Sequence, residues 1–336
     1  MYTWGDNVKN LGRNPENRPH TWPSAVEAEL KDIPKRSVVG LGETLLVQAN
    51  EKVIGFGSNG KFSQLTEAPS VAADFVADAD IDESFAVYLT KEGAVEVDLG
   101  GDDRVSLGIN PETRAVACNR RDFFAVTSGA GGEKVFHLNK HALRDGSYEL
   151  CLNEPVTREI HARKAGIAKL RAAGGSAAAL LTNGSLLTWG SNSRGVVGHP
   201  RSELVIADHY FSNPQDPLAL AGIKGKVKNF ELSANVLVVQ TEDDRVFFCG
   251  LENVFLLREV KLPQGLQASL IGCWEGHFVV VTKDNKIFSN ADFKESPALC
   301  RRYDDLGLYR IDNAFFDGKK IEWLGGKYSN ALAYCT

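Results

Sequence analysis

Residues 173–190 read AGGSAAALLTNGSLLTWG, and the rest of the chain repeats this pattern in weaker form. An apolar run over residues 177–181 leads into Asn183-Gly184, and a second apolar run ends at Trp189-Gly190. Asn-Gly between two apolar runs is a strong hairpin signal because both residue types tolerate positive φ. The stretch therefore predicts two antiparallel strands joined by a tight turn.

Two other segments end in the same way as this hairpin. Residues 2–7 and 53–59, like residues 187–192, are short β-prone runs that finish in an aromatic residue, glycine, a polar residue and asparagine. Weaker hairpin patterns occupy residues 85–97, 123–137, 237–250 and 278–288. A hairpin that recurs along a whole chain indicates a repeat architecture of β type rather than a helical solenoid.

The spacing of these copies predicts the number of units. The motif glycine, or the residue in its place, falls at positions 5, 57, 100, about 138, 190, 250 and about 290. The steps are roughly 40 to 60 residues, and 336 residues divided by seven gives 48. Periods of this size are typical of β-propellers. We therefore predict an all-β fold, a single seven-bladed β-propeller.

The two ends of the chain complement each other. Residues 321–335 look like the first half of a repeat, and residues 1–7 look like the second half. Pairing them in one blade would close the ring and remove two exposed sheet edges. We predict one domain, 1–336, with these repeat units: 321–336 joined to 1–12, 38–65, 72–101, 115–139, 167–198, 227–253 and 268–293.

The repeat resembles that of the regulator of chromosome condensation family, Gly-x-x-His, strand, turn, strand, Trp-Gly-x-Asn-x-x-Gly-x-Leu-Gly. The residues that carry the resemblance are Trp4, Gly5, Asn7, Gly57, Asn59, Trp189, Gly190, Asn192 and His277. Repeats three, four, six and seven lack the Trp-Gly-x-Asn corner. The resemblance implies a propeller whose motif aromatics (Trp4, Phe56, Trp189 and Phe248) pack between blades.

Composition excludes several broad classes. The net charge of −5 gives no overall attraction to nucleic acid or anionic membranes. The N-terminus has no signal-peptide pattern, and no run of about 18 apolar residues predicts a membrane span. Six scattered cysteines without a C-x-x-C pair suit reduced thiols. We expect a monomer in the cytoplasm or nucleus, and the sequence does not choose between the two.

Three motifs invite a chemical interpretation, and each has a simpler structural one. Residues 55–61, GFGSNGK, match two phosphate-loop patterns, but the same glycines recur at strand ends in other repeats. His137 and His141 have metal-ligand spacing on a helix, yet they straddle a predicted strand exit. Residues 128–132 suit a wide hairpin turn. We expect no catalytic, cofactor or metal residues.

The candidate partner-binding residues are Trp22, Asp98, Asp102 and Asp103. The aspartates belong to an acidic stretch around the third hairpin, which forms either a solvated rim or a face that steers a basic partner. Trp22 lies between prolines in a predicted loop, and either anchors an interface or fills a gap between blades. Basic residues over 158–171 are assigned to a charged loop or short helix, with nucleic-acid binding as the alternative.

Two functions of different classes follow from these features. The first is a non-enzymatic protein-interaction propeller, an adaptor or regulatory subunit. Compact relatives that the chain resembles imply partners in diphthamide synthesis and tRNA modification, or chromatin-linked enzymes. The second is a guanine nucleotide exchange factor for a small GTPase, the activity of the family's founder, with acidic residues loosening bound nucleotide. A hydrolytic or lyase propeller is a third, weaker option.

Overall fold

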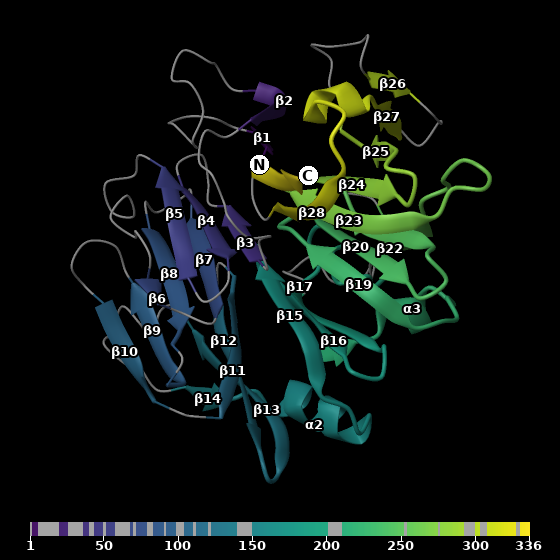
Figure 1. Ribbon diagram of the computed structural model, residues 1–336. Coiled ribbons are helices and arrows are strands. Elements are labelled where there is room, and N and C mark those ends of the chain that lie inside the picture. Colours follow the sequence, from purple (N-terminus) through teal and green to yellow (C-terminus); the bar gives the residue numbers. More distant parts are fainter. Residues whose placement is uncertain are drawn as a thin grey trace.

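A computed structural model shows the chain as a succession of antiparallel sheets (Figure 1). The structure describes residues 2–5, 20–25, 36–39, 44–49, 52–57, 68–69, 72–78, 83–90, 92–98, 104–109, 112–119, 122–139, 150–200, 210–251, 254–274, 276–291, 300–302, 308–326 and 330–336. The all-β prediction is confirmed, and the strands of these residues form seven sheets.

We number the sheets I to VII in chain order and give their strands from the inner to the outer edge. Sheet I holds β28 (Ile321–Gly326), β29 (Asn330–Cys335), β1 (Tyr2–Gly5) and β2 (His20–Ala25). Sheet II holds β3 (Arg36–Val39), β4 (Thr44–Ala49), β5 (Lys52–Gly57) and β6 (Ala68–Pro69). Sheet III holds β7 (Ala72–Asp78), β8 (Glu83–Leu89), β9 (Ala94–Asp98) and β10 (Arg104–Ile109). Sheet IV holds β11 (Thr113–Cys118), β12 (Asp122–Gly129), β13 (Gly132–Asn139) and β14 (Cys151–Leu152).

The remaining sheets follow the same plan. Sheet V holds β15 (Ile167–Ala173), β16 (Ser176–Leu181), β17 (Leu186–Ser191) and β18 (Tyr210–Gln215). Sheet VI holds β19 (Val227–Leu232), β20 (Val236–Thr241), β21 (Val246–Gly250) and β22 (Val254–Glu259). Sheet VII has five strands, β23 (Ala268–Trp274), β24 (His277–Thr282), β25 (Ile287–Ser289), β27 (Tyr309–Ile311) and β26 (Cys300–Arg302).

Sheet I joins the two ends of the chain. Strand β1 pairs antiparallel with β29, with Tyr2 opposite Ala333 and Gly5 opposite Asn330. The N and C labels lie next to each other in Figure 1. The innermost strands of the sheets contact one another in the order β3, β7, β11, β15, β19, β23, β28, and β28 contacts β3 again. The predicted pairing of terminal strands within one sheet is therefore present.

The core lies between neighbouring sheets. The second strands β12, β16, β20 and β24 are buried almost throughout, because a sheet covers each of their faces. Helix α2 (Glu154–Ala162) inserts Val156 and Ile160 into the layer between sheets IV and V. Two shorter helices, α3 (Pro217–Leu220) and the 3₁₀ helix η1 (Asn313–Phe316), lie in connections between strands. Burial between sheets explains why the second strands are apolar runs without alternation.

The hairpin after the second strand has the same geometry in four sheets. Gly93, Gly184, Asp244 and Asn285 have φ of 82°, 85°, 61° and 60°, and each donates its N–H to the carbonyl three residues earlier. This is the three-residue hairpin in which the last loop residue is left-handed. Glycine, aspartate and asparagine adopt this conformation more readily than other residues. In sheet V the left-handed residue is Gly184, while Asn183 keeps a negative φ.

A second shared feature, a bulge near the start of the inner strand, could not be predicted from the sequence. In sheets I, IV, V, VI and VII the pairing of the inner strand with its neighbour skips one residue, always the second of the strand. The skipped residues are Arg114, Ala168, Lys228, Ser269 and Glu322. Such bulges increase the local twist of the strand. They depend on strand pairing, and no residue type marks them.

Two predicted details are wrong. Trp22 was assigned to a loop, but it lies in strand β2, which pairs with β1 through Ser24 opposite Thr3. Proline is tolerated there because β2 is the outermost strand of its sheet, where a missing N–H breaks no ladder. The turn over residues 128–132 is tight rather than wide, since Gly129 pairs directly with Gly132.

Candidate functional site

The clearest group of interacting charged side chains lies on two inner strands. Lys169 and Arg171 alternate on β15, so their side chains leave the same face of that strand. The Nζ of Lys169 donates to Glu231 Oε1 at 2.5 Å, to Asn229 Oδ1 at 2.8 Å and to the Phe230 carbonyl at 2.7 Å. These contacts join sheet V to sheet VI. We call Lys169, Arg171 and Glu231 the inner-strand charge cluster.

Arg171 completes the cluster with weaker contacts. Its Nε lies 3.4 Å from Glu231 Oε2, and its Nη1 donates to the Leu170 carbonyl at 3.2 Å. The side chains of Lys169, Arg171 and Glu231 are 18%, 23% and 12% exposed. Two cations therefore share one carboxylate in a largely desolvated position.

Burial sets the protonation behaviour of the cluster. Desolvation lowers the pKa of Lys169 to about 8, although the Glu231 carboxylate favours the charged ammonium. Desolvation alone would raise the pKa of Glu231, but Lys169 and Arg171 outweigh it and hold that pKa below its usual value. Glu231 is accordingly a carboxylate at neutral pH. Burial raises the pKa of the neighbouring Cys273 thiol well above its ordinary value, which makes that cysteine a poor nucleophile.

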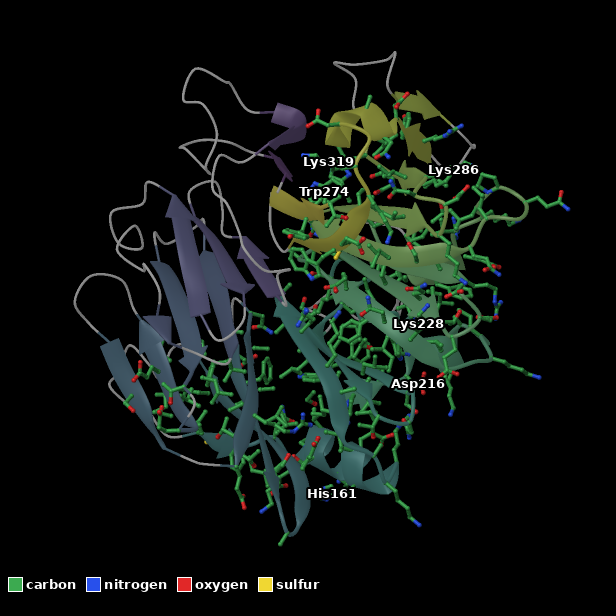
Figure 2. The ribbon with its side chains drawn as sticks, in the orientation of Figure 1. His161, Asp216, Lys228, Trp274, Lys286 and Lys319 are labelled. Atoms are coloured by element: carbon green, nitrogen blue, oxygen red, sulfur yellow. The ribbon has the colours of Figure 1, made fainter. Side chains whose placement is uncertain are left out.

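Each sheet presents one turn on either side of the molecule. The first turn joins the inner strand to the second strand, and the second turn joins the second strand to the third. Because the strands are antiparallel, first turns lie on one side and second turns on the other. Arg171 is two residues from the end of β15 and close to the first-turn side. Lys228 is the second residue of β19 and lies near the second-turn side, whereas Trp274 ends β23 on the first-turn side; both residues are labelled in Figure 2.

The second-turn side carries ion pairs between sheets. The Asp244 carboxylate forms an ion pair with Lys228 of its own sheet at 2.7 Å and another with Lys283 of sheet VII at 2.8 Å. Gln240 donates to the Ala268 carbonyl at 3.0 Å, again from sheet VI to sheet VII. In the same turns Arg245 pairs with Asp243 and Lys286 pairs with Asp284, each at 2.8 Å. We therefore assign the contacts between sheets VI and VII to holding these neighbouring sheets together.

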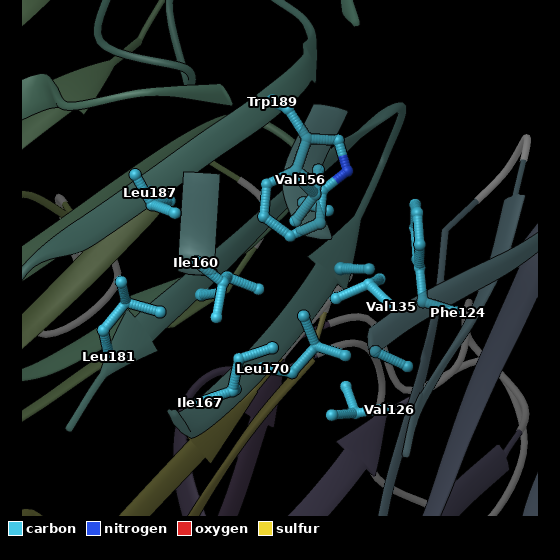
Figure 3. Packing of buried hydrophobic residues seen from close by; sticks show 14 residues of the cluster. Phe124, Val126, Val135, Val156, Ile160, Ile167, Leu170, Leu181, Leu187 and Trp189 are labelled. Carbon is cyan, nitrogen blue, oxygen red and sulfur yellow. The ribbon is translucent and has the colours of Figure 1, made fainter. Parts of the chain in front are cut away.

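The motif residues of sheet V have structural roles. Trp189 is 1% exposed and packs edge-on against Phe124 of sheet IV, with ring centroids 5.7 Å apart (Figure 3). Gly190 has φ of 99°, and a Cβ there would lie 2.4 Å from the Gly175 carbonyl oxygen. The Asn192 side chain accepts from the Val197 N–H and donates to the His199 carbonyl, which fixes the following loop.

His277 begins β24 and faces Trp274, with ring centroids 5.5 Å apart. Burial lowers the pKa of His277, so its ring is neutral at neutral pH. Among the described residues its Nδ1 has no hydrogen-bond partner. Phe248 packs against Phe278 of sheet VII at 5.0 Å, which confirms packing between sheets. The position equivalent to Trp189 is nevertheless Cys249, because both residues pair with the second residue of the neighbouring strand.

The predicted partner-binding residues are not brought together by the described structure. Asp98 is the last residue of β9, and Trp22 lies in β2 of a different sheet. Asp102, Asp103, Asn7 and Asn59 lie outside the described residues. Trp4 and Gly5 lie in β1, and Gly57 ends β5, as the repeat pattern predicts. The partner role of Trp22 and the three aspartates stays a prediction.

The basic residues over 158–171 form two groups rather than one charged loop or short helix. Arg158 and His161 belong to α2, whose His161 appears at the bottom of Figure 2. Arg163 ends that helix and pairs with Asp216 at 2.9 Å. Lys169 and Arg171 instead belong to the inner strand and pair with Glu231, a residue that sequence reasoning missed. Polar residues at alternate positions of both inner strands, 169 and 171, then 229 and 231, would have indicated it.

Metal, membrane and disulfide features can be stated for the described ranges. They contain no cluster of histidine, cysteine and acidic residues that could hold a metal ion. Within the same ranges, no helix is both long and apolar enough to cross a membrane. The cysteines whose side chains the structure describes form no disulfide: Cys118, Cys151, Cys249, Cys273 and Cys335.

Comparisons with known proteins identify the fold. No protein-family model matches the chain, and no curated protein sequence matches it. Human WBSCR16 superposes with a TM-score of 0.67 at 14% identity, over 100% of this chain and 98% of that one. Prp20p of Saccharomyces cerevisiae superposes with a TM-score of 0.69 at 14% identity, over 100% of this chain and 91% of that one.

The same yeast protein, called RCC1 (Prp20) and bound to Kap60, also gives a TM-score of 0.69 at 14% identity, over 100% of this chain and 88% of that one. The resemblance stated from the repeats is therefore confirmed as a likeness of fold over the full chain. This chain has an RCC1-type propeller fold.

Proposed function

We propose that this chain is a non-enzymatic protein-interaction propeller that acts as an adaptor or regulatory subunit of a larger complex. One observation carries the proposal, the likeness of fold to Prp20p over the whole chain. That yeast structure was described together with its binding to Gsp1p and histones, and with Kap60 bound. Protein partners are thus the kind of ligand that this fold is known to take.

The form that we propose is a closed ring of seven blades, one for each sheet. Two contacts support it, the pairing of β1 with β29 and the return contact between β28 and β3. Inter-sheet ion pairs and buried clusters would then make the ring rigid. A rigid ring presents its two faces and its rim to partners with little loss of conformational entropy on binding.

Nucleotide exchange on a small GTPase is the second candidate function. The binding of Prp20p to Gsp1p favours it. The residues that we assign to it are Asp98, Asp102 and Asp103, whose carboxylates would act on bound nucleotide and its magnesium. The adaptor and the exchange factor differ in one measurable property, the rate at which a bound GTPase loses nucleotide.

Affinity capture of the tagged full-length protein from its own cells, followed by mass spectrometry, tests the proposal. We expect a stoichiometric partner that is not a GTPase, and its identity would place the complex in tRNA modification, diphthamide synthesis, chromatin or another pathway. Any GTPase recovered is then loaded with fluorescent nucleotide and mixed with the pure chain.

Unchanged nucleotide release supports the adaptor. Faster release that is lost when Asp98, Asp102 and Asp103 are all changed to Ala would replace the adaptor by the exchange factor. A triple change at Asp243, Asp284 and Asp312 to Ala is the matched control, because it removes three carboxylates from connections that do not belong to sheet III.

A further inference from the structure

The inner-strand charge cluster contains two cations and only one anion. Lys169 and Arg171 together bring two positive charges, and Glu231 brings one negative charge. The charged groups that act most strongly on Lys169 are Glu231 and Arg171, and those that act most strongly on Glu231 are Lys169 and Arg171. The cluster therefore has a net positive charge in a position that is mostly withdrawn from water.

Lys169 and Arg171 differ in how many of their N–H donors have a hydrogen-bond acceptor. The three hydrogens of the Lys169 ammonium have three acceptors, all within 2.8 Å. Arg171 has five N–H donors, but its contact to Glu231 is long and its contact through Nη1 goes to a carbonyl of its own strand. Its Nη2 has no acceptor in the described part of the chain. The unsatisfied donors of the cluster belong to Arg171.

The Arg171 guanidinium stays charged, because the pKa of a guanidinium is too high for it to lose a proton at neutral pH. A lysine in the same place could become neutral, as the lowered pKa of Lys169 illustrates. A planar guanidinium with free donors suits the two oxygens of a carboxylate, which accept in parallel from it. The turn after β15, Gly174-Gly175, has no side chains that would cover Arg171 from the first-turn side.

We propose that Arg171 binds a carboxylate group, which approaches the inner strands from the first-turn side and completes the charge balance of the cluster. Glu231 and Lys169 hold the guanidinium in place, and Nη2 donates to the incoming oxygen. The carboxylate has two chemical sources, an aspartate or glutamate side chain of a protein partner or a small dicarboxylic acid. The first source rests on the proposed function, and the second does not.

Binding is measured by isothermal titration calorimetry at low salt with two pairs of probes. Glutarate is compared with glutaramide, its neutral isostere, and the capped peptide Gly-Glu-Glu-Gly with capped Gly-Gln-Gln-Gly. We expect wild-type protein to bind one or both acidic probes and neither neutral probe. Binding of the peptide alone assigns the site to a partner's side chain, and binding of glutarate alone assigns it to a small acid.

Two variants locate the binding at Arg171. Arg171→Gln should weaken binding of the acidic probe at least about 10-fold, because a charge-assisted pair of hydrogen bonds is lost. Arg171→Lys keeps the charge and the pairing with Glu231, and should give an intermediate loss. Arg245→Gln is the matched control, since Arg245 is exposed, pairs with Asp243 on the second-turn side and should leave binding unchanged.

No binding of either acidic probe to the wild type would overturn the proposal. So would equal binding by wild type and Arg171→Gln, or equal binding of glutarate and glutaramide. These results leave the adaptor function untouched, because it is tested by the captured partner. Conversely, glutarate binding that depends on Arg171 would persist even if capture recovered no partner.

Discussion

Sheets V and VI have the same backbone but very different sequences at the third strand. Sheet V keeps the full motif, Trp189-Gly190-Ser191-Asn192, and sheet VI has Cys249-Gly250-Leu251 in its place. Gly190 and Gly250 have φ of 99° and 105°, and a Cβ would meet a carbonyl oxygen at 2.4 Å and 2.2 Å. The N–H of the next residue donates to that same carbonyl in both sheets, at 2.9 Å.

The difference between the third strands of sheets V and VI shows which residue of the motif the fold requires. The glycine is kept because the backbone passes too close to its neighbour for any side chain. The tryptophan is replaceable, since Cys249 fills its smaller site beside Val196 and Gly198 of the loop that follows β17. Phe248, one residue earlier, then supplies the aromatic contact to sheet VII. Erosion of the aromatic corner therefore leaves the sheet intact.

The largest effect is expected at the two shared glycines. Gly190→Ala and Gly250→Ala should each lower the free energy of unfolding by on the order of 4 kcal/mol, through positive φ and a backbone clash. Gly222→Ala, at φ of 68° with open space around it, should cost only about 1 kcal/mol. Urea unfolding of the three variants checks this. Similar small losses in all three would show that the close approach is unimportant.

Exchanging the residue that differs sharpens the comparison. Trp189→Cys places the sheet VI residue in sheet V and should cost about 3 kcal/mol, because it opens a cavity against Phe124. Cys249→Ala should cost about 1 kcal/mol, because little volume is removed. Thermal unfolding followed by circular dichroism measures both. Equal losses would mean that the two sites do not differ in packing.

The contact between the two sheets gives a pH-dependent prediction. Glu231→Gln should cost about 2 kcal/mol near neutral pH, because it leaves Lys169 and Arg171 without their carboxylate. The folded-state pKa of Glu231 is lowered, so its contribution is complete above its ordinary pKa and is lost as pH falls through the folded value. The stability gap between wild type and variant should therefore stay constant near neutral pH and narrow as pH falls below the ordinary glutamate pKa of 4.5. A gap that widens over this range would contradict the assignment.

A smaller effect than at Glu231 is expected at the motif asparagine. Asn192→Ala removes two hydrogen bonds that hold the loop after β17, and should cost about 1.5 kcal/mol. Asn183→Ala, in the exposed turn of the same sheet, should cost less than about 1 kcal/mol. Urea unfolding of the two variants gives the comparison. A larger loss at Asn183 would reverse the importance that we assign to the two positions.

Much of the fold could be predicted because the hairpin is a local signal. Asn183-Gly184 between apolar runs identified sheet V, and weaker turns such as residues 282–286 identified sheet VII. The outer strand β2 with Trp22 was missed because it lies at a sheet edge and has no apolar run or turn motif of its own. The bulge at Lys228 was missed because register is a property of pairing between strands.

The charge cluster was predictable only in part. Lys169 and Arg171 belong to the basic residues over 158–171, and the assignment of these residues to a charged loop or short helix hid the strand that carries the two. Glu231 is 62 residues from Lys169, and only the contact between sheets V and VI brings the two together. Sequence spacing contains no information about such a pair until the order of the sheets is known.

Hydrogen exchange of the backbone amides in strands β1 and β29 tests the closed ring most directly. If sheet I joins the ends of the chain as the pairing of Tyr2 with Ala333 indicates, both strands should exchange as slowly as β16 and β20. Protection should also be lost together with theirs when urea is added. Rapid exchange in β1 while β16 stays protected would contradict a closed, cooperative propeller.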